Sequence, residues 1–421
     1  MTPAFFNYGE YANEVIIPVA GIAHHTDMSP RRAAGNVALL GIAQALSTCA
    51  PIVVTLLGGI VGVRLAPEGW STLPMSVMII TLASGAIPAS MLMRRIGRRA
   101  GFAGGGVLGA IGALVVALAL YRESFGLLCT GTMLMGVNGS FAMQYRFAAA
   151  ESVALHNVSR AISGVLLGTV LAAWAGPELA ARARLLVPEV EYAGSFFVLA
   201  AFLLASAVLV ACIREPEPRQ LAEEGEERPL SQVFRQPTLI IAVMSAAVGY
   251  GVMNLVMTAT PISMHVMHGH SIDATAMVIQ SHVLAMYLPS LGSGLLIGWL
   301  GIPAVMAMGV LLLGATVVAG LSGHEIHSYW LALVSLGVGW NLLFVSGTTL
   351  LTRQYRASER FKVQAANDVT VFGASALGSL LAGRIVFLMG WETLMYTCLP
   401  LLAIMSLAII RLARLPKTAT A

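Results

Sequence analysis

The sequence predicts an all-α membrane protein in which twelve transmembrane helices form two six-helix halves. Of its 421 residues, 57% are hydrophobic and only 10% are charged, and the mean hydropathy is +0.81. Soluble globular domains carry about 25% charged residues. About a dozen apolar stretches of roughly 20 residues recur between Asn36 and Arg411, and that length lets a helix cross the ~30 Å hydrocarbon layer. We therefore expect the chain to move or sense a solute across a bilayer.

The apolar stretches give the positions of the spans in chain order. Residues 1–30 are polar, so no cleavable signal peptide is expected before the first span. An even number of spans places both ends of the chain on one side of the membrane. The expected spans are 36–63, 72–93, 100–121, 125–148, 160–178, 194–213, 238–263, 273–299, 302–322, 328–350, 363–388 and 391–412.

The longest polar interruption falls at the middle of the chain. It contains Glu-Glu-Gly-Glu-Glu at 223–227 and four prolines. Two six-helix halves joined in this way are the plan of many secondary transporters, whose substrate binds near the bilayer midplane between them. Recruitment of a partner by the linker is the alternative. The expected organisation is a tail at 1–35, a six-helix half at 36–213, a cytoplasmic linker at 214–237, a second six-helix half at 238–412 and a tail at 413–421.

Basic residues indicate the orientation of the chain. With the amino terminus in the cytoplasm, all but five of the 24 lysines and arginines lie on the cytoplasmic side. This bias is the positive-inside rule, and it predicts that both termini are cytoplasmic. The net charge of +4 then comes from arginines that contact the headgroups of the lipid bilayer, and no nucleic-acid partner is expected. The five exceptions are Arg64, Arg122, Arg182, Arg184 and Arg384.

A basic loop between the second and third spans carries a family resemblance. Residues 90–99 read Ser-Met-Leu-Met-Arg-Arg-Ile-Gly-Arg-Arg. This resembles the gate loop of the major facilitator superfamily, Gly-x-x-x-Asp-Arg-x-Gly-Arg-Arg, with Ser90 and Arg94 in place of the family's Gly and Asp. A basic turn that follows the charge bias is the alternative interpretation. The resemblance implies the superfamily fold and alternating access. The matching gate-loop residues are Arg95, Gly97, Arg98 and Arg99.

No enzyme is predicted. The chain has no Walker-type Gly-x-x-x-x-Gly-Lys-Ser/Thr loop, so primary active transport is not expected. Its four cysteines are scattered through apolar spans and have no zinc-ligand spacing. We therefore expect no resident cofactor.

Two pairs of residues inside the spans are candidates for the transport path. Met253 and Met257 share one helix face, and His282 and Met286 share a face of the next span. Thioether sulfur and imidazole nitrogen suit Cu(I) better than sodium or magnesium. The alternatives are methionine as ordinary core filler and a histidine that relays protons or is a simple hydrogen-bond partner.

A proline follows each pair by about one turn. Pro261 and Pro289 lack a backbone N–H, so both helices are expected to kink there and to free carbonyl groups. The same region carries a closer resemblance. Residues 250–289 resemble the CcoA-type bacterial copper importers, in which these two motifs are the proposed copper-binding elements. The likeness extends to 143–151 and 364–373.

This resemblance implies import of copper, as the transported substrate rather than a cofactor, across the bacterial inner membrane. The copper would serve cuproenzyme assembly, such as that of cytochrome oxidase. RfnT-type riboflavin importers look similar in the same regions, so riboflavin uptake is the alternative. A flavin site needs aromatic faces and polar groups. The candidates for it are Tyr145, Tyr250, Asn254, Tyr287, Trp340, Asn341, Phe344 and Asn367.

Buried charges supply candidates for coupling or gating. Arg146 and Glu151 lie at the inner end of the fourth span, five residues apart, so they need not pair. Asp368, beside Asn367 in the eleventh span, could carry a proton, with protons as the coupling ion. A gate salt bridge between Asp368 and Arg146 is the alternative. A non-transporting receptor would usually carry a soluble domain, which is not seen in this sequence.

Overall fold

The computed structural model describes residues 29–67, 69–154, 157–214 and 228–415. Within these ranges the chain is helical and contains no β-strand. The amino-terminal helices are α2 (Pro30–Val53), η1 (Val54–Gly58), α3 (Gly59–Leu65), α4 (Leu73–Ile96), α5 (Arg98–Tyr121), α6 (Phe125–Ala142), α7 (Tyr145–Glu151), α8 (Val158–Ala183), η3 (Arg184–Leu186) and α9 (Ala193–Ala211).

The carboxy-terminal helices begin with the short helix α10. In chain order they are α10 (Leu230–Val233), α11 (Pro237–Pro261), η4 (Ile262–Met267), α12 (Ile272–Tyr287), α13 (Ser290–Leu300), α14 (Ile302–Leu321), α15 (Ile326–Thr352), η5 (Ala357–Glu359) and α16 (Arg360–Arg414).

These helices provide twelve membrane spans. Ten helices among the described residues are long and apolar enough to cross a bilayer. The bent pair α12 and α13 adds one more span. The last of the ten, Lys362–Arg414, contains two helices joined at Gly390, whose φ of +84° is not helical. The twelve helices predicted from the sequence are therefore confirmed.

Three spans depart from a regular α-helix at or just after a proline, whereas Pro88, Pro177 and Pro400 lie inside continuous helices. α12 and α13 meet at Pro289 with a bend of 45°, which confirms the kink expected there. After Pro261 the helix widens into the π-helical turn η4, and after Pro51 the first span widens in the same way into η1. A proline leaves the carbonyl four residues earlier without its donor, so the ladder opens nearby.

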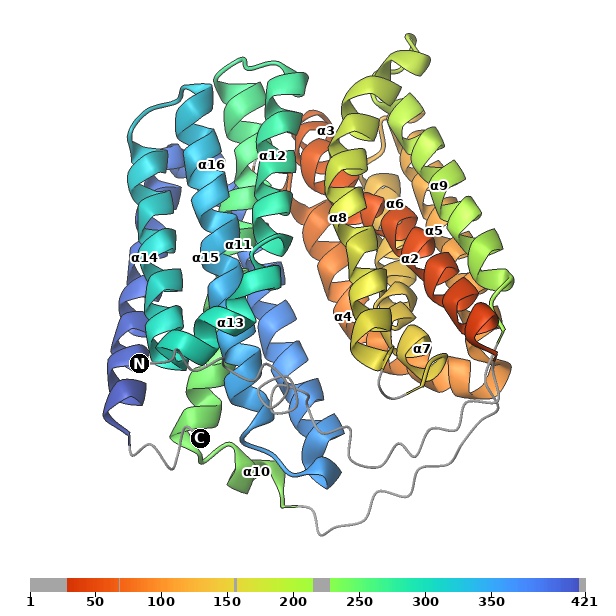
Figure 1. The fold of residues 1–421 in the computed structure, drawn as a ribbon. Coiled ribbons are helices and arrows are strands. Elements are labelled where there is room, and N and C mark those ends of the chain that lie inside the picture. The colour runs from red at the N-terminus through yellow and green to blue at the C-terminus, as the bar shows by residue number, and fades with distance from the viewer. Residues whose placement is uncertain (1–28, 68, 155–156, 215–227, 416–421) are drawn as a thin grey trace, which may run out of the picture.

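Helices before residue 212 pack mainly on one another, and so do those after residue 237 (Figure 1). The two groups meet along α8 with α12 and along α4 with α16. Between α4 and α16, Thr72 Oγ1 donates to the Leu380 carbonyl and accepts from the Gly383 N–H. Gln280 Nε2 of α12 donates to the Trp174 carbonyl of α8. Thr72 lies in the segment that follows α3, and Gln280 lies in α12; both helices are labelled in the upper half of Figure 1.

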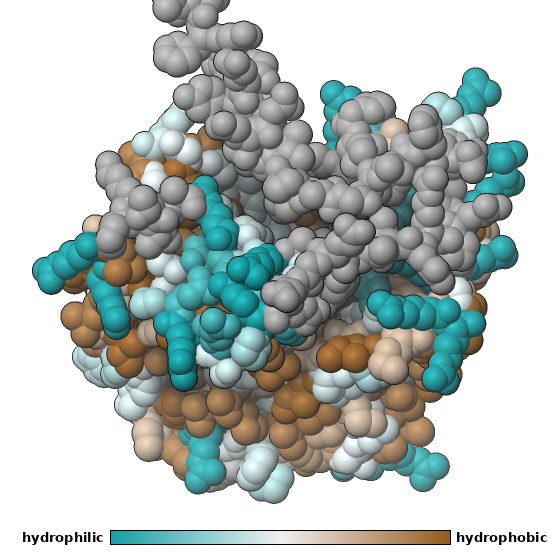
Figure 2. Space-filling model, turned by 90° about the horizontal axis from the view of Figure 1, so that it is seen from below, coloured by the Kyte–Doolittle hydropathy of each residue, from teal (hydrophilic) through white to brown (hydrophobic). Residues whose placement is uncertain are grey.

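The described chain begins and ends at the lower end of the bundle in Figure 1, where α2 starts and α16 finishes. Figure 2 shows this face, with hydrophilic side chains gathered on it and projecting from its edges. Of the predicted segments, residues 1–28, 215–227 and 416–421 lie outside the described residues. The boundaries of the two halves, the linker and the tails stay predictions, as does the cytoplasmic position of this face.

Candidate functional site

Five aromatic rings from four helices meet in what we call the aromatic cluster. Tyr250 of α11 lies at its centre, with ring centroids 5.1 Å from Trp340, 5.4 Å from Phe344 and 5.9 Å from Phe372. Trp340 and Phe344, one turn apart on α15, are stacked at 5.2 Å. Tyr287 of α12 meets Trp340 edge-on at 6.1 Å. Edge-to-face pairs of this kind are a favoured aromatic geometry.

Small residues let these helices approach closely. α11 packs on both α15 and α16, and α12 packs mainly on α15. A Cβ added at Gly347 of α15 would lie 2.9 Å from the Ala242 carbonyl of α11, and one at Gly378 of α16 would overlap the Gly251 carbonyl of α11. Glycine at helix contacts permits this approach in membrane proteins. The rings of the aromatic cluster are therefore held by backbone packing on both sides of α11.

The aromatic cluster is open at its edges and has unpartnered polar atoms. Trp340 is buried, whereas the other four rings are only half-buried. Trp340 Nε1 has no hydrogen-bond partner among the described residues, and neither has Asn341 Oδ1. The Asn341 Nδ2 donates to the Met286 carbonyl at 2.7 Å and to Ser290 Oγ at 2.5 Å. A buried orphan donor or acceptor costs about 1–3 kcal/mol, so a ligand that pairs with both atoms recovers that free energy.

Charged groups lie beside the aromatic cluster and come from both groups of helices. Arg146 of α7 interacts electrostatically with Asp368 of α16 and with Tyr250. Both charged side chains are exposed. Asn367 Nδ2 donates to Asp368 Oδ1 at 3.1 Å, and the Arg146 guanidinium carbon lies 4.9 Å from the Phe147 ring centroid. Arg146 and Asp368 are thus within electrostatic range of each other but form no salt bridge in this structure, so the gate pair stays a prediction.

Glu151 pairs with the predicted gate loop rather than with Arg146. Arg98 Nη2 lies 2.7 Å from Glu151 Oε1, and both side chains are partly exposed. Exposed pairs of this kind contribute about 0–1 kcal/mol. Gly97, which separates α4 from α5, has a φ of +84° that strongly favours glycine. Arg95 and Arg99 are exposed beside it. The short helix α7 therefore carries Glu151, which is paired with the gate loop, and Arg146, which is within electrostatic range of Asp368.

The four predicted copper ligands are all buried. The His282 Nδ1 lies 2.7 Å from the Leu333 carbonyl of α15 and must donate to it, while Nε2 has no partner among the described residues. α12 packs mainly on α15 and makes few contacts with α11, which carries Met253 and Met257. Among the described residues, the hydrogen bond of His282 goes to Leu333 of α15, and the ligand role of the four residues, including Met286, stays a prediction.

Histidine, cysteine and carboxylate side chains are the other common metal ligands in proteins. Within the part of the chain that the structure describes, no group of three or more such side chains is placed to hold a metal ion. That observation does not concern methionine sulfur, so a copper site that includes methionine stays a prediction.

The flavin candidates divide by position. Tyr250, Tyr287, Trp340 and Phe344 belong to the aromatic cluster, and Asn341 adjoins it. Asn254 also adjoins the cluster, since its Nδ2 donates to the Tyr250 carbonyl at 3.3 Å and to Ser375 Oγ at 2.6 Å, and Asn367 bonds Asp368 beside the cluster. Tyr145 lies elsewhere and meets Phe102 edge-on at 4.8 Å. Sequence reasoning missed Phe372. Its spacing of four residues from Asp368 was the signal that could have found it, since such residues share a helix face.

Comparison with known proteins assigns the family. The family model of the Major Facilitator Superfamily matches residues 50–357. Over 391 residues, which are 92% of this chain and 97% of the relative, the sequence is 37% identical to the riboflavin transporter RfnT of Brucella anthropi.

Solved structures share the fold at low identity. A bacterial homolog of the human lysosomal transporter Spinster, in an inward-facing and unoccupied conformation, has a TM-score of 0.71 at 16% identity and covers 93% of this chain and 99% of its own. A bacterial metal transporter has a TM-score of 0.62 at 14% identity and covers 90% and 99%. Together with the twelve spans, these matches show that the chain is a multi-pass secondary transporter that belongs to the major facilitator superfamily.

Proposed function

We propose that this transporter imports riboflavin, or a flavin with the same ring system, across the bacterial inner membrane. The aromatic cluster is the observation that carries the proposal. It offers several ring faces beside an unpartnered donor and an unpartnered acceptor. The 37% identity to a riboflavin transporter over most of the chain supports it. Riboflavin thus takes precedence over copper, which the sequence resemblance placed first.

The isoalloxazine ring suits this surface because it is flat and has both an apolar and a polar edge. Stacking on Tyr250 and Phe344 contributes about 0.5–1.5 kcal/mol for each aromatic pair beyond the burial of apolar area. Trp340 Nε1 donates to a ring carbonyl in this proposal, and Asn341 Oδ1 accepts from the ring N–H. The ribityl hydroxyls then lie towards Asp368, whose carboxylate accepts hydrogen bonds.

Transport in this proposal follows alternating access between the two halves. The hydrogen bonds between the helix groups lie at the upper end of the molecule, so we infer an inward-facing state with the lower end in the cytoplasm. The inferred orientation agrees with the hydrophilic side chains on the lower face and with the positive-inside bias of the sequence. Arg146 and Asp368 interact across the halves, and breaking that pair is the step we assign to substrate or proton binding.

Copper remains the second candidate because of one observation. His282 Nε2 is buried without a partner among the described residues, and the Nδ1–H···O bond to Leu333 leaves that nitrogen with a free lone pair in the neutral ring. A histidine held through its other nitrogen is a common arrangement for a metal ligand. Met286, one turn away, would add a sulfur.

Uptake of radiolabelled riboflavin and radiolabelled copper, measured side by side in proteoliposomes, tests the proposal. We expect riboflavin uptake by the wild-type protein. The variant Phe344→Ala should lower riboflavin uptake about tenfold, the scale of one lost aromatic stack. The matched variant Phe197→Ala changes an exposed ring on α9 and should leave uptake unchanged. Copper uptake without riboflavin uptake by the wild-type protein would overturn the proposal.

A further inference from the structure

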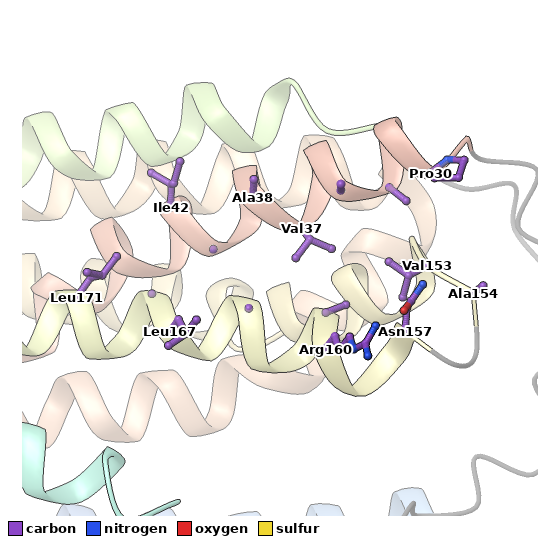
Figure 3. A pocket seen from close by; sticks show the side chains of 16 residues that line it. Pro30, Val37, Ala38, Ile42, Val153, Ala154, Asn157, Arg160, Leu167 and Leu171 are labelled. Carbon is purple, nitrogen blue, oxygen red and sulfur yellow. The ribbon is translucent and has the colours of Figure 1, made fainter. Parts of the chain in front are cut away.

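An apolar groove lies between α2 and α8, on the flank of the amino-terminal helices (Figure 3). Its volume is about 630 Å³, and its lining comes only from residues 30–42 and 153–171. Figure 3 shows the lining side chains along the two helices, with Arg160 and Asn157 together near the end where α8 begins. No residue of the aromatic cluster lines this groove. It is therefore separate from the proposed transport site.

The groove forms because the two helices cross closely at one point and separate below it. A Cβ at Gly41 would lie 3.2 Å from the Gly164 carbonyl, and one at Gly168 would overlap the Gly41 carbonyl. Between this crossing and the lower end of the bundle, the facing side chains are small, including Ala38 and Ala161. Small side chains do not fill the space between separating helices, so a void remains that a flexible apolar chain fits.

The surroundings of the groove have the chemistry of a lipid. Ile42, Leu167 and Leu171 line it and are 50%, 58% and 61% exposed, within helices long and apolar enough to span the membrane. Exposed apolar residues on spanning helices face hydrocarbon. At the lower end, Arg160 lines the groove and is exposed, and Arg31 follows the lining residue Pro30. Basic residues at the membrane surface attract anionic headgroups.

We propose that this groove binds an anionic glycerophospholipid, with one acyl chain between α2 and α8 and its phosphate at Arg160. The occupant is a lipid rather than a protein partner because the apolar lining ends in a cationic mouth at the membrane surface. α8 also contacts α12 of the other group of helices. A lipid held against α8 therefore contacts one of the two helices that must move apart when the halves rock.

Native mass spectrometry of the purified full-length protein tests this site. The protein is delipidated in detergent and titrated with phosphatidylglycerol or with phosphatidylcholine that has the same acyl chains. We expect phosphatidylglycerol to bind more tightly. Arg160→Gln should lower that preference about fivefold, the change expected from one basic residue near an anionic surface. Ala38→Trp should weaken both lipids about tenfold, the change expected when two methylenes lose their burial.

Matched variants on α16 provide the controls. Arg411→Gln removes an exposed arginine near the same end of the bundle, and Ala403→Trp adds an indole at an exposed alanine. Both should bind the two lipids as the wild type does. Equal binding of both lipids by the wild type, or an unchanged preference in Arg160→Gln, would overturn the headgroup assignment. Displacement of the lipid by glycerol phosphate alone would show an anion site without an acyl chain and would overturn the proposal.

Discussion

Replacement of Trp340 by phenylalanine separates the binding role of its N–H from its packing role. Trp340 is buried, and its Nε1 has no hydrogen-bond partner among the described residues. Phenylalanine keeps a ring at the stacking distance of 5.2 Å from Phe344 but removes the donor. The substitution breaks no hydrogen bond in the ligand-free protein. It also removes the free-energy cost of burying an unpaired donor, and this gain offsets part of the packing energy that the smaller ring loses. We expect the free energy of unfolding to change by less than about 1.5 kcal/mol.

Riboflavin binding should respond much more strongly. The loss of one hydrogen bond to a neutral ligand group weakens binding by about 0.5–1.5 kcal/mol, and the smaller ring adds a comparable loss of contact. The dissociation constant should therefore rise by about tenfold or more. Quenching of riboflavin fluorescence by the detergent-solubilised protein measures this constant, and a thermal melt of the same sample measures stability.

Trp391 offers the matched control. It is also buried, but its Nε1 donates to the Gly320 carbonyl at 2.8 Å. Trp391→Phe should lower stability by about 1–3 kcal/mol, because it leaves that carbonyl without its donor, and should leave riboflavin binding unchanged. A dissociation constant within about twofold of the wild type in Trp340→Phe would refute the donor role. So would an equal loss of binding in both variants.

Three further changes test the remaining assignments. Asp368→Asn should lower the maximal uptake rate at least about tenfold while riboflavin binding persists, because it removes the charge that interacts with Arg146. Full uptake with an unchanged pH profile would reject both the gate role and the proton role. His282→Gln and Met286→Leu should leave riboflavin uptake intact, and loss of copper uptake in both would restore the copper interpretation. Hydrogen bonds from Arg228 lower the pKa of Glu359 to about 2, so this pair stabilises the protein above about pH 4.5 and the stabilisation is lost as the pH falls towards 2. Glu359→Gln should therefore lower the melting temperature at pH 7, and an unchanged melt would contradict the contribution of this pair.

The sequence predicted which types of residue form the candidate site, but not which individual residues come together there. Tyr250, Tyr287 and Trp340 are conspicuous in the sequence because aromatic residues suit a flavin and lie within apolar spans. Tyr145 meets the same criterion, yet it packs on Phe102 among the amino-terminal helices. Spacing along one helix cannot tell these cases apart, because membership depends on which helices become neighbours.

The amino-acid sequence by itself determined the features that depend on the bilayer and on local backbone chemistry. Apolar length sets the number of spans, since each helix must satisfy its backbone groups within itself in lipid. The helix bends at Pro289 because proline cannot donate the next helical hydrogen bond, and it breaks at Gly390 because glycine readily adopts a positive φ.

Only the tertiary structure decided which distant side chains meet. It joined Arg98 to Glu151, placed Arg146 within electrostatic range of Asp368, and bonded His282 to α15. The physical reason is that helix packing in a membrane depends on small residues and close contact at specific faces. These contacts form between residues tens to hundreds of positions apart, and no local pattern in the sequence records them.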